Sequence, residues 1–161
     1  MNRRTALKLS LTAVVSSLVL ASPNVLAANS NGPTYTDKKG RAINGYDTVA
    51  YFTKKKAIKG NPKFQTSWNH GTWFFSSQEN LELFKRSPEK YAPQYGGYCA
   101  YAVSLDRLVQ IDPTQFTIIG QKLYLTYHPR IQRRWDKKRA DYLIDSEKNW
   151  PKLLKKVQKN I

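Results

Sequence analysis

The chain has 161 residues, of which 40% are hydrophobic and 12% aromatic, so it is long enough for one domain with a real core and too short for two domains of ordinary size. It carries 27 basic and 11 acidic side chains, a net charge of +16, which favours anionic partners or a solvated basic surface and says nothing of the fold. A single cysteine, Cys99, excludes an intramolecular disulfide.

The first 27 residues predict a secretory signal peptide. A basic start that includes Arg3 and Arg4 precedes an apolar run at 9–21, and small residues end it at Ala27. We therefore expect cleavage after Ala27 or one residue later, and a periplasmic or secreted protein. The paired arginines also resemble the twin-arginine export signal, although Ala6 stands where that pattern prefers phenylalanine. The ordinary and the twin-arginine export routes both stay open.

The mature chain begins with a polar stretch at 28–41, which we expect to be a flexible lead-in to a domain at 42–161. Residues 42–52 contain a turn at Gly45 and Asp47 and a short buried segment. Two runs rich in strand-forming residues, 64–68 and 72–75, flank Asn69-His70-Gly71 and predict a hairpin.

Helical patterns follow the first hairpin. Ser76 or Ser77 can cap a helix that ends before Pro88, and a short helical turn covers 88–92. A second hairpin is predicted from 116–119 and 122–127, with Leu123 and Leu125 on one face and Tyr124 on the other. A basic helix over 130–148 and a last helix that starts at 149–151 complete the domain. The fold class predicted is α+β, with hairpins that carry helices on one side.

Residues 91–103, YAPQYGGYCAYAV, hold the only cysteine and the only Gly-Gly pair, Gly96 and Gly97. The pair predicts a tight turn, and the alternation after it predicts a strand that begins near Cys99. Cys99 then has two interpretations. It is either a small buried hydrophobic residue, or a metal ligand or reactive thiol in a pocket lined by Tyr98 and Tyr101.

Four blocks in order carry a resemblance to a known family. They are GYDTVAYF from Gly45, the long block from Trp68 to Val103, KLYLTY from Lys122 and NWPKLL from Asn149. From Ile43 onward the chain resembles the small exported proteins of the YHS-domain family. The resemblance implies a small α+β unit that also occurs in copper-transporting ATPases and is related to cysteine-based metal-binding domains.

The chain departs from this pattern at the metal ligands. The resemblance places the two cysteines of metal-binding relatives at Ser76 and Asn80, so both thiolates are replaced. A soft transition metal such as copper prefers sulfur ligands, and after removal of the leader the chain offers Cys99 and no methionine. His70, expected in a hairpin turn, and His128, expected to contact a helix start, are further candidate ligands without the spacing typical of a metal site.

Three functions compete. The first is a non-catalytic binding protein that holds a metal ion or small ligand near Cys99, with Tyr98, Tyr101 and Asp47 beside it. The second is a basic interaction module for an anionic partner or a membrane surface, whose binding salt would weaken. Nucleic acid is not an expected partner of an exported protein. The third is a thiol enzyme, which would need a base that the sequence does not place near Cys99.

Overall fold

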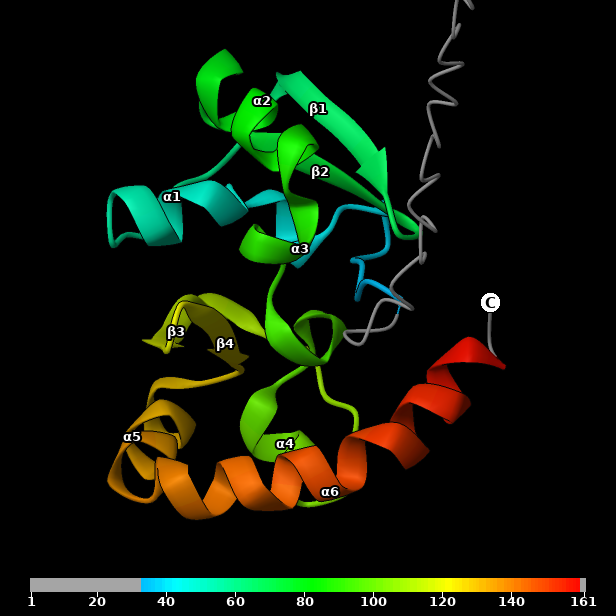
Figure 1. Cartoon of the computed structure of the whole chain (residues 1–161), viewed down its shortest axis with the longest axis vertical. Coiled ribbons are helices and arrows are strands. Elements are labelled where there is room, and N and C mark those ends of the chain that lie inside the picture. The colour runs from blue at the N-terminus through cyan, green and yellow to red at the C-terminus, as the bar shows by residue number, and fades with distance from the viewer. Residues whose placement is uncertain (1–32, 160–161) are drawn as a thin grey trace, which may run out of the picture.

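The computed structural model describes residues 33–159 and confirms the α+β class (Figure 1). The predicted signal peptide at 1–27 lies outside the described residues. In chain order the elements are η1 (Ile43–Gly45), α1 (Thr48–Thr53), β1 (Asn61–Trp68), β2 (Gly71–Phe75), α2 (Gln78–Arg86), α3 (Pro88–Tyr91), η2 (Gln94–Gly97), α4 (Ala100–Ser104), β3 (Asp112–Ile119), β4 (Lys122–Thr126), α5 (Pro129–Lys137) and α6 (Arg139–Gln158).

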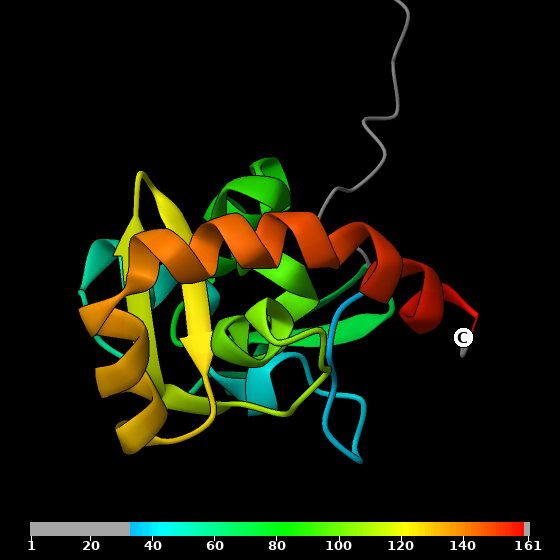
Figure 2. The ribbon, with the colours of Figure 1, turned by 90° about the horizontal axis from the view of Figure 1, so that it is seen from below.

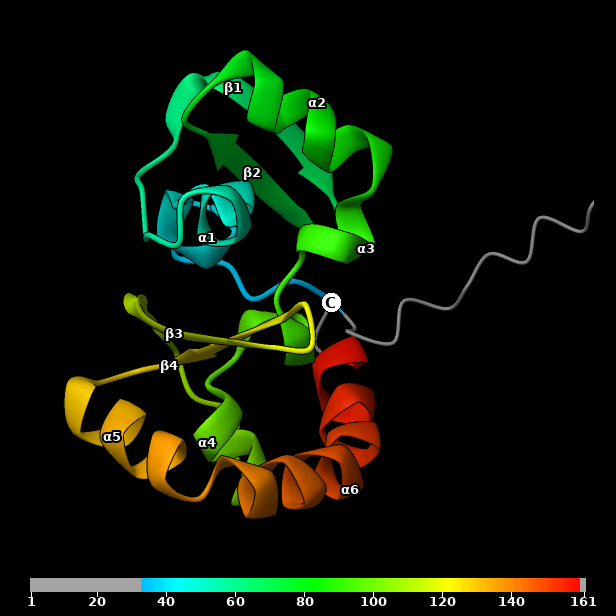
Figure 3. The ribbon, with the colours of Figure 1, turned by 60° about the vertical axis from the view of Figure 1, so that its left-hand side comes forward.

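The described residues form two packed layers with the second hairpin between them. Figure 3 shows α1, α2, α3 and the β1–β2 hairpin above the β3–β4 hairpin, and α4, α5 and α6 below it. Leu123 and Leu125 of β4 belong to the upper hydrophobic core, whereas Tyr124 belongs to the lower one. The predicted alternation along β4 is confirmed. This hairpin is covered on both faces rather than on one, because each face closes a different core.

The first hairpin forms at the predicted place. Asn69 and His70 make the turn with positive φ angles of 47° and 66°. Ser77 caps α2, since its hydroxyl accepts a hydrogen bond from the backbone N–H of Asn80 at 3.2 Å. The strand β1 begins earlier than predicted, with an irregularity in register between Asn61 and Gln65. Ser76 lies between the last residue of β2, Phe75, and the cap of α2, Ser77.

The predicted helix boundaries in the C-terminal third are wrong. The basic helix ends at Lys137, and Lys138 leaves helical geometry with φ −137° and ψ 33°. The next helix, α6, then continues through Pro151 to Gln158 instead of starting near it. Trp150 and Leu153, which are buried on either side of the proline, hold the helix against the lower core. Seen from below, α6 runs the length of this face (Figure 2).

The described part of the predicted lead-in is attached to the domain. The backbone N–H of Thr34 donates to Asn69 O at 3.1 Å, and that of Tyr35 donates to Gly96 O at 2.7 Å. Thr34 is itself buried. Residues 33–36 therefore pack beside the hairpin turn and the Gly-Gly turn, because both turns present backbone carbonyls to this segment.

Candidate functional site

Cys99 does not begin a strand, which corrects the prediction. It is the residue before α4, and its backbone N–H donates to Val109 O at 3.0 Å. The Gly-Gly turn is present, since Gly96 and Gly97 have φ angles of 61° and 87°. The alternation that suggested a strand also fits a short helix between two cores, because Cys99 faces the upper core and Ala100 the lower one.

The Cys99 side chain is fully buried and neutral. Its residue has an exposed fraction of 0%, and burial raises the pKa of the thiol, although backbone hydrogen bonds from Ala102, Tyr127 and Tyr101 act in the opposite direction. Metal binding and nucleophilic attack both use the thiolate and need access to it. The geometry agrees with the interpretation of Cys99 as a small core residue.

The two tyrosines beside Cys99 point to different parts of the molecule. The Tyr98 ring packs edge-on against Tyr35 of the N-terminal segment, with 5.3 Å between ring centroids. Tyr101 packs against Tyr142 of α6 at 5.0 Å. Burial, and then the neighbouring Tyr35, raise the pKa of Tyr98. Tyr98 thus packs the Gly-Gly turn against the N-terminal segment, and Tyr101 packs α4 against α6.

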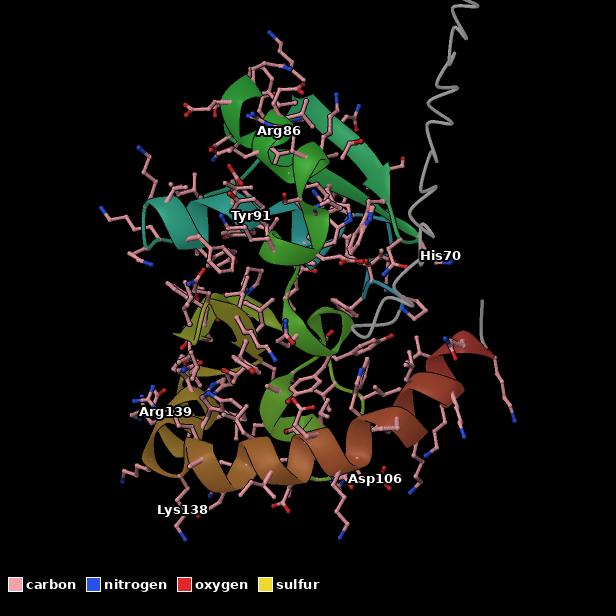
Figure 4. All side chains as sticks on the ribbon, in the orientation of Figure 1. His70, Arg86, Tyr91, Asp106, Lys138 and Arg139 are labelled. Carbon is pink, nitrogen blue, oxygen red and sulfur yellow. The ribbon has the colours of Figure 1, made fainter. Side chains whose placement is uncertain are left out.

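The two histidines lie apart, each at the surface. His70 is exposed in the β1–β2 turn, on an open hollow of about 370 Å³, and Figure 4 shows it at the edge of the upper layer. His128 precedes α5, and its Nδ1 accepts from the backbone N–H of Arg130 at 3.1 Å. The predicted contact of His128 with a helix start is confirmed. Among residues 33–159, no three His, Cys, Asp or Glu side chains gather as a metal site would require.

Asp47 lies at the centre of a buried hydrogen-bond network instead of beside Cys99. Its Oδ1 caps α1 by accepting from the backbone N–H groups of Val49 at 2.9 Å and Ala50 at 3.2 Å. Its Oδ2 accepts from the Ser76 backbone N–H at 2.8 Å and hydroxyl at 2.6 Å. The Asn80 side-chain amide donates to the same oxygen at 2.7 Å. One carboxylate therefore joins the start of α1 to the end of β2 and the first turn of α2.

Two of the three residues of the network are buried, and only Ser76 is exposed to solvent. Asp47 is 0% exposed and Asn80 is 7% exposed, whereas Ser76 is exposed. None of the ion pairs among the described residues includes Asp47. Hydrogen bonds alone therefore offset the cost of burying this carboxylate, which is the usual requirement for a buried polar group.

A second feature that the sequence only outlined is a row of cations that runs along α5 to the first residue of α6. We call it the cationic corner, and it consists of Arg130, Arg133, Arg134, Lys137, Lys138 and Arg139. All six are exposed, and none makes an ion pair or a side-chain hydrogen bond within residues 33–159. Figure 4 shows Lys138 and Arg139 at the outer edge of the lower layer.

The acidic residue within this stretch does not neutralise it. Asp136 accepts from the Gln132 side-chain amide at 3.2 Å and from the Thr117 hydroxyl at 3.3 Å, both on the side towards β3. Like charges three or four residues apart on a helix repel, by a few tenths of a kcal/mol per pair. The corner cations therefore repel one another, and Asp136 forms no ion pair with any of them.

Comparison with known protein families identifies the upper layer. The model of the YHS domain matches residues 49–95, from α1 to the Gly-Gly turn. The chain carries a YHS domain. This confirms the YHS resemblance over residues 49–95, and the blocks from Lys122 and Asn149 lie outside the match. Comparison with curated proteins and with solved structures returns no match.

The network does not fit the metal that the YHS resemblance implies. Ser76 and Asn80, where the resemblance puts the two cysteines of metal-binding relatives, offer a hydroxyl and an amide, whereas copper(I) and other soft metals prefer sulfur. A carboxylate has about four acceptor sites, and that of Asp47 already accepts five hydrogen bonds. In this YHS domain, Asp47, Ser76 and Asn80 satisfy their hydrogen bonds with one another and leave no free ligand atom on the carboxylate.

Beyond the YHS domain, the remaining chain completes its core and adds the lower layer. Leu123 and Leu125 of β4 pack into the upper core, and the Tyr51 hydroxyl donates to Pro113 O at 2.8 Å. Among the described residues, none of the helices has the length and apolar character needed to cross a membrane. The cationic corner belongs to the lower layer, in which α5 contacts β3 and β4.

Proposed function

We propose that this protein is an exported, non-catalytic interaction module, in which the YHS domain is a structural scaffold and the cationic corner binds an anionic partner. The observation that carries the proposal is the set of six exposed cations at 130–139, none of them ion-paired among the described residues. An anionic partner would relieve the repulsion within this set. The proposed export rests on the signal-peptide pattern of residues 1–27.

The non-catalytic part of the proposal is supported by the state of the candidate nucleophile. Cys99 is fully buried and its pKa is raised by burial, so the thiolate is disfavoured. His70 and His128 are exposed, and the Nδ1 of His128 accepts from the backbone N–H of Arg130. Neither observation favours an imidazole base for the buried Cys99 thiol.

A metal-handling role is the alternative, because the YHS match favours it. Under this alternative a metal ion or small ligand would be held near Cys99 or at Asp47, Ser76 and Asn80. It would require the side chains of the network to rearrange, since Asp47 is fully hydrogen-bonded. This role and the interaction role make different predictions about metal content and about salt.

The experiment is a salt titration of binding to heparin, a generic polyanion, by calorimetry. Two triple variants are compared with the parent chain. The first, R130Q/R133Q/R134Q, removes three charges from the corner, and the second, K148Q/K155Q/K159Q, removes three from α6. Both variants have the same net charge, and Lys148, Lys155 and Lys159 are likewise exposed and without ion pairs among the described residues.

The proposal predicts that the corner variant binds much more weakly than the α6 variant. It also predicts that binding by the parent chain falls steeply above about 0.1 M salt, where the Debye length is about 10 Å. Equal losses in the two variants would show that only total charge matters and would contradict the proposal. Absence of binding at low salt would contradict it as well.

A further inference from the structure

We propose that the anionic partner of the cationic corner is a phosphate-bearing lipid surface, on which the outer face of α5 lies flat. This inference rests on the proposed function and specifies its partner. It depends on which cations form the corner, on how α5 presents them, and on what surrounds them. Each of these is a property of the described residues.

Arginine supplies four of the six cations of the corner, whereas lysine predominates in the rest of the chain. Four of the nine arginines lie within residues 130–139, whereas 16 of the 18 lysines lie elsewhere. The planar guanidinium group donates two parallel hydrogen bonds to a phosphate, whereas lysine acts as a compact point charge. If the stretch served solubility alone, lysine would serve equally well. The choice of arginine points to phosphate groups.

The helix α5 fixes these side chains on one outward face. Arg130, Arg133, Arg134 and Lys137 follow the spacing i, i+3, i+4, i+7, while Ile131 and Trp135 are buried on the opposite side. Trp135 is 0% exposed, and its ring stacks on that of Tyr142 of α6 at 6.2 Å. Figure 3 shows α5 at an outer corner of the lower layer, away from α1 and α2. The four cations therefore share the side of α5 that is turned away from the buried Trp135.

The surroundings of the corner suit a lipid surface better than a protein partner. A stable protein interface buries about 800 Å² on each partner around an apolar core. The large hydrophobic residues exposed within the described part of the chain are only Leu105, Tyr127 and Ile144, each on a different element or loop. Phosphate head groups need no such core, because cations near an anionic bilayer contribute individually.

Tyr127 and an adjoining hollow extend the face towards the start of α5. Tyr127 is 41% exposed, and it lines an open hollow of about 310 Å³ with His128, Arg130 and Ile131. A tyrosine side chain has a polar hydroxyl and an apolar ring, and it is therefore suited to the level of lipid head groups. The Tyr127 ring thus lines the same hollow as Arg130, and it would contact the head-group region when the arginines bind phosphate.

The test is co-sedimentation with vesicles at low ionic strength. One set of vesicles contains phosphatidylglycerol in phosphatidylcholine, and the other is pure phosphatidylcholine. The processed protein is compared with the R130Q/R133Q/R134Q and K148Q/K155Q/K159Q variants and with R130K/R133K/R134K, which keeps the charge. All four chains share the same N-terminus, so its contribution cancels. Thermal unfolding checks that each variant is folded.

We expect the parent chain to bind the anionic vesicles and not the neutral ones. The corner variant should lose affinity by on the order of 100-fold, and the α6 variant by only a few-fold. The lysine variant should fall between the parent and the corner variant, because it keeps charge but not the two-pronged phosphate contact.

Equal losses in the corner and α6 variants would overturn the inference, and so would absence of binding to anionic vesicles. If heparin binding depends on the corner but vesicles are not bound, this inference fails and the proposed function stands. The partner would then be a soluble polyanion or an acidic protein. If neither heparin nor vesicles are bound, both proposals fail.

Discussion

Replacement of Asp47 by alanine tests whether the buried network holds the YHS domain together. The change removes the cap of α1, which typically contributes about 1 kcal/mol. It also removes the 2.7 Å acceptor of the Asn80 amide, which is only 7% exposed and keeps only a longer bond of 3.3 Å to the Ser76 hydroxyl, and this loss costs about 1–3 kcal/mol. Ser76 is exposed, so water can replace its lost bonds. We therefore expect the free energy of unfolding to fall by about 3 kcal/mol.

Urea unfolding followed by the fluorescence of the four tryptophans measures this loss. Glu82→Ala is the control, because Glu82 pairs with Lys85 at 3.3 Å at the surface, where both side chains are 46% exposed and such pairs contribute less than about 1 kcal/mol. In the double variant with Asn80→Ala, the losses should not add. A loss in Asp47→Ala no larger than in the control would refute the reasoning.

Four further outcomes follow from the core. Native Cys99 should react with a thiol reagent only as fast as the protein unfolds, and rapid labelling would show an open site. Because burial raises the pKa of this thiol above its ordinary value of 9.0, the unfolded chain loses the proton first and stability should fall above about pH 9, less so in Cys99→Ser. Leu123→Ala should cost about 2–5 kcal/mol, since this β4 residue is 0% exposed in the upper core, and an unchanged urea midpoint would contradict its role. Tyr95→Phe removes the hydrogen bond to Glu147 at 3.1 Å and should lower stability by about 0.5–1.5 kcal/mol, which the same urea titration detects.

Both hairpins could be predicted because their signals are local. Asn69 and His70 favour a turn, and the alternation of Leu123, Tyr124 and Leu125 follows the period of a strand. The structure puts Leu123 and Leu125 in one core and Tyr124 in the other. The sequence was sufficient to predict these hairpins, because residues adjacent in sequence determine them.

Helix boundaries could not be predicted where packing opposes local preference. Pro151 normally interrupts a helix, but α6 passes through it because Trp150 and Leu153 are buried on either side. No glycine or proline near Lys138 signals the break between α5 and α6. The helix after Cys99 was taken for a strand because a few alternating residues fit either period when both sides are buried.

The candidate site was predicted residue by residue but not as an arrangement. Asp47, Ser76 and Asn80 were each singled out, yet Asp47 was assigned to Cys99, because contacts across 29 and 33 residues leave no local signal. A capping position at Asp47 and two polar residues at the relatives' cysteine positions were the available clues. The cationic corner was seen as a basic helix face, but its lack of ion pairs depends on where Asp136 points.

Whether this YHS domain is a scaffold or holds a metal is decided by the metal content of the processed protein, purified after export without an affinity tag and measured by mass spectrometry. The parent chain is compared with the Asp47→Ala and Cys99→Ser variants. We expect no stoichiometric metal in any of the three, because Asp47 is saturated by hydrogen bonds and Cys99 is buried as a neutral thiol. Stoichiometric metal in the parent chain that is lost in either variant would contradict the account and establish a metal-handling YHS protein.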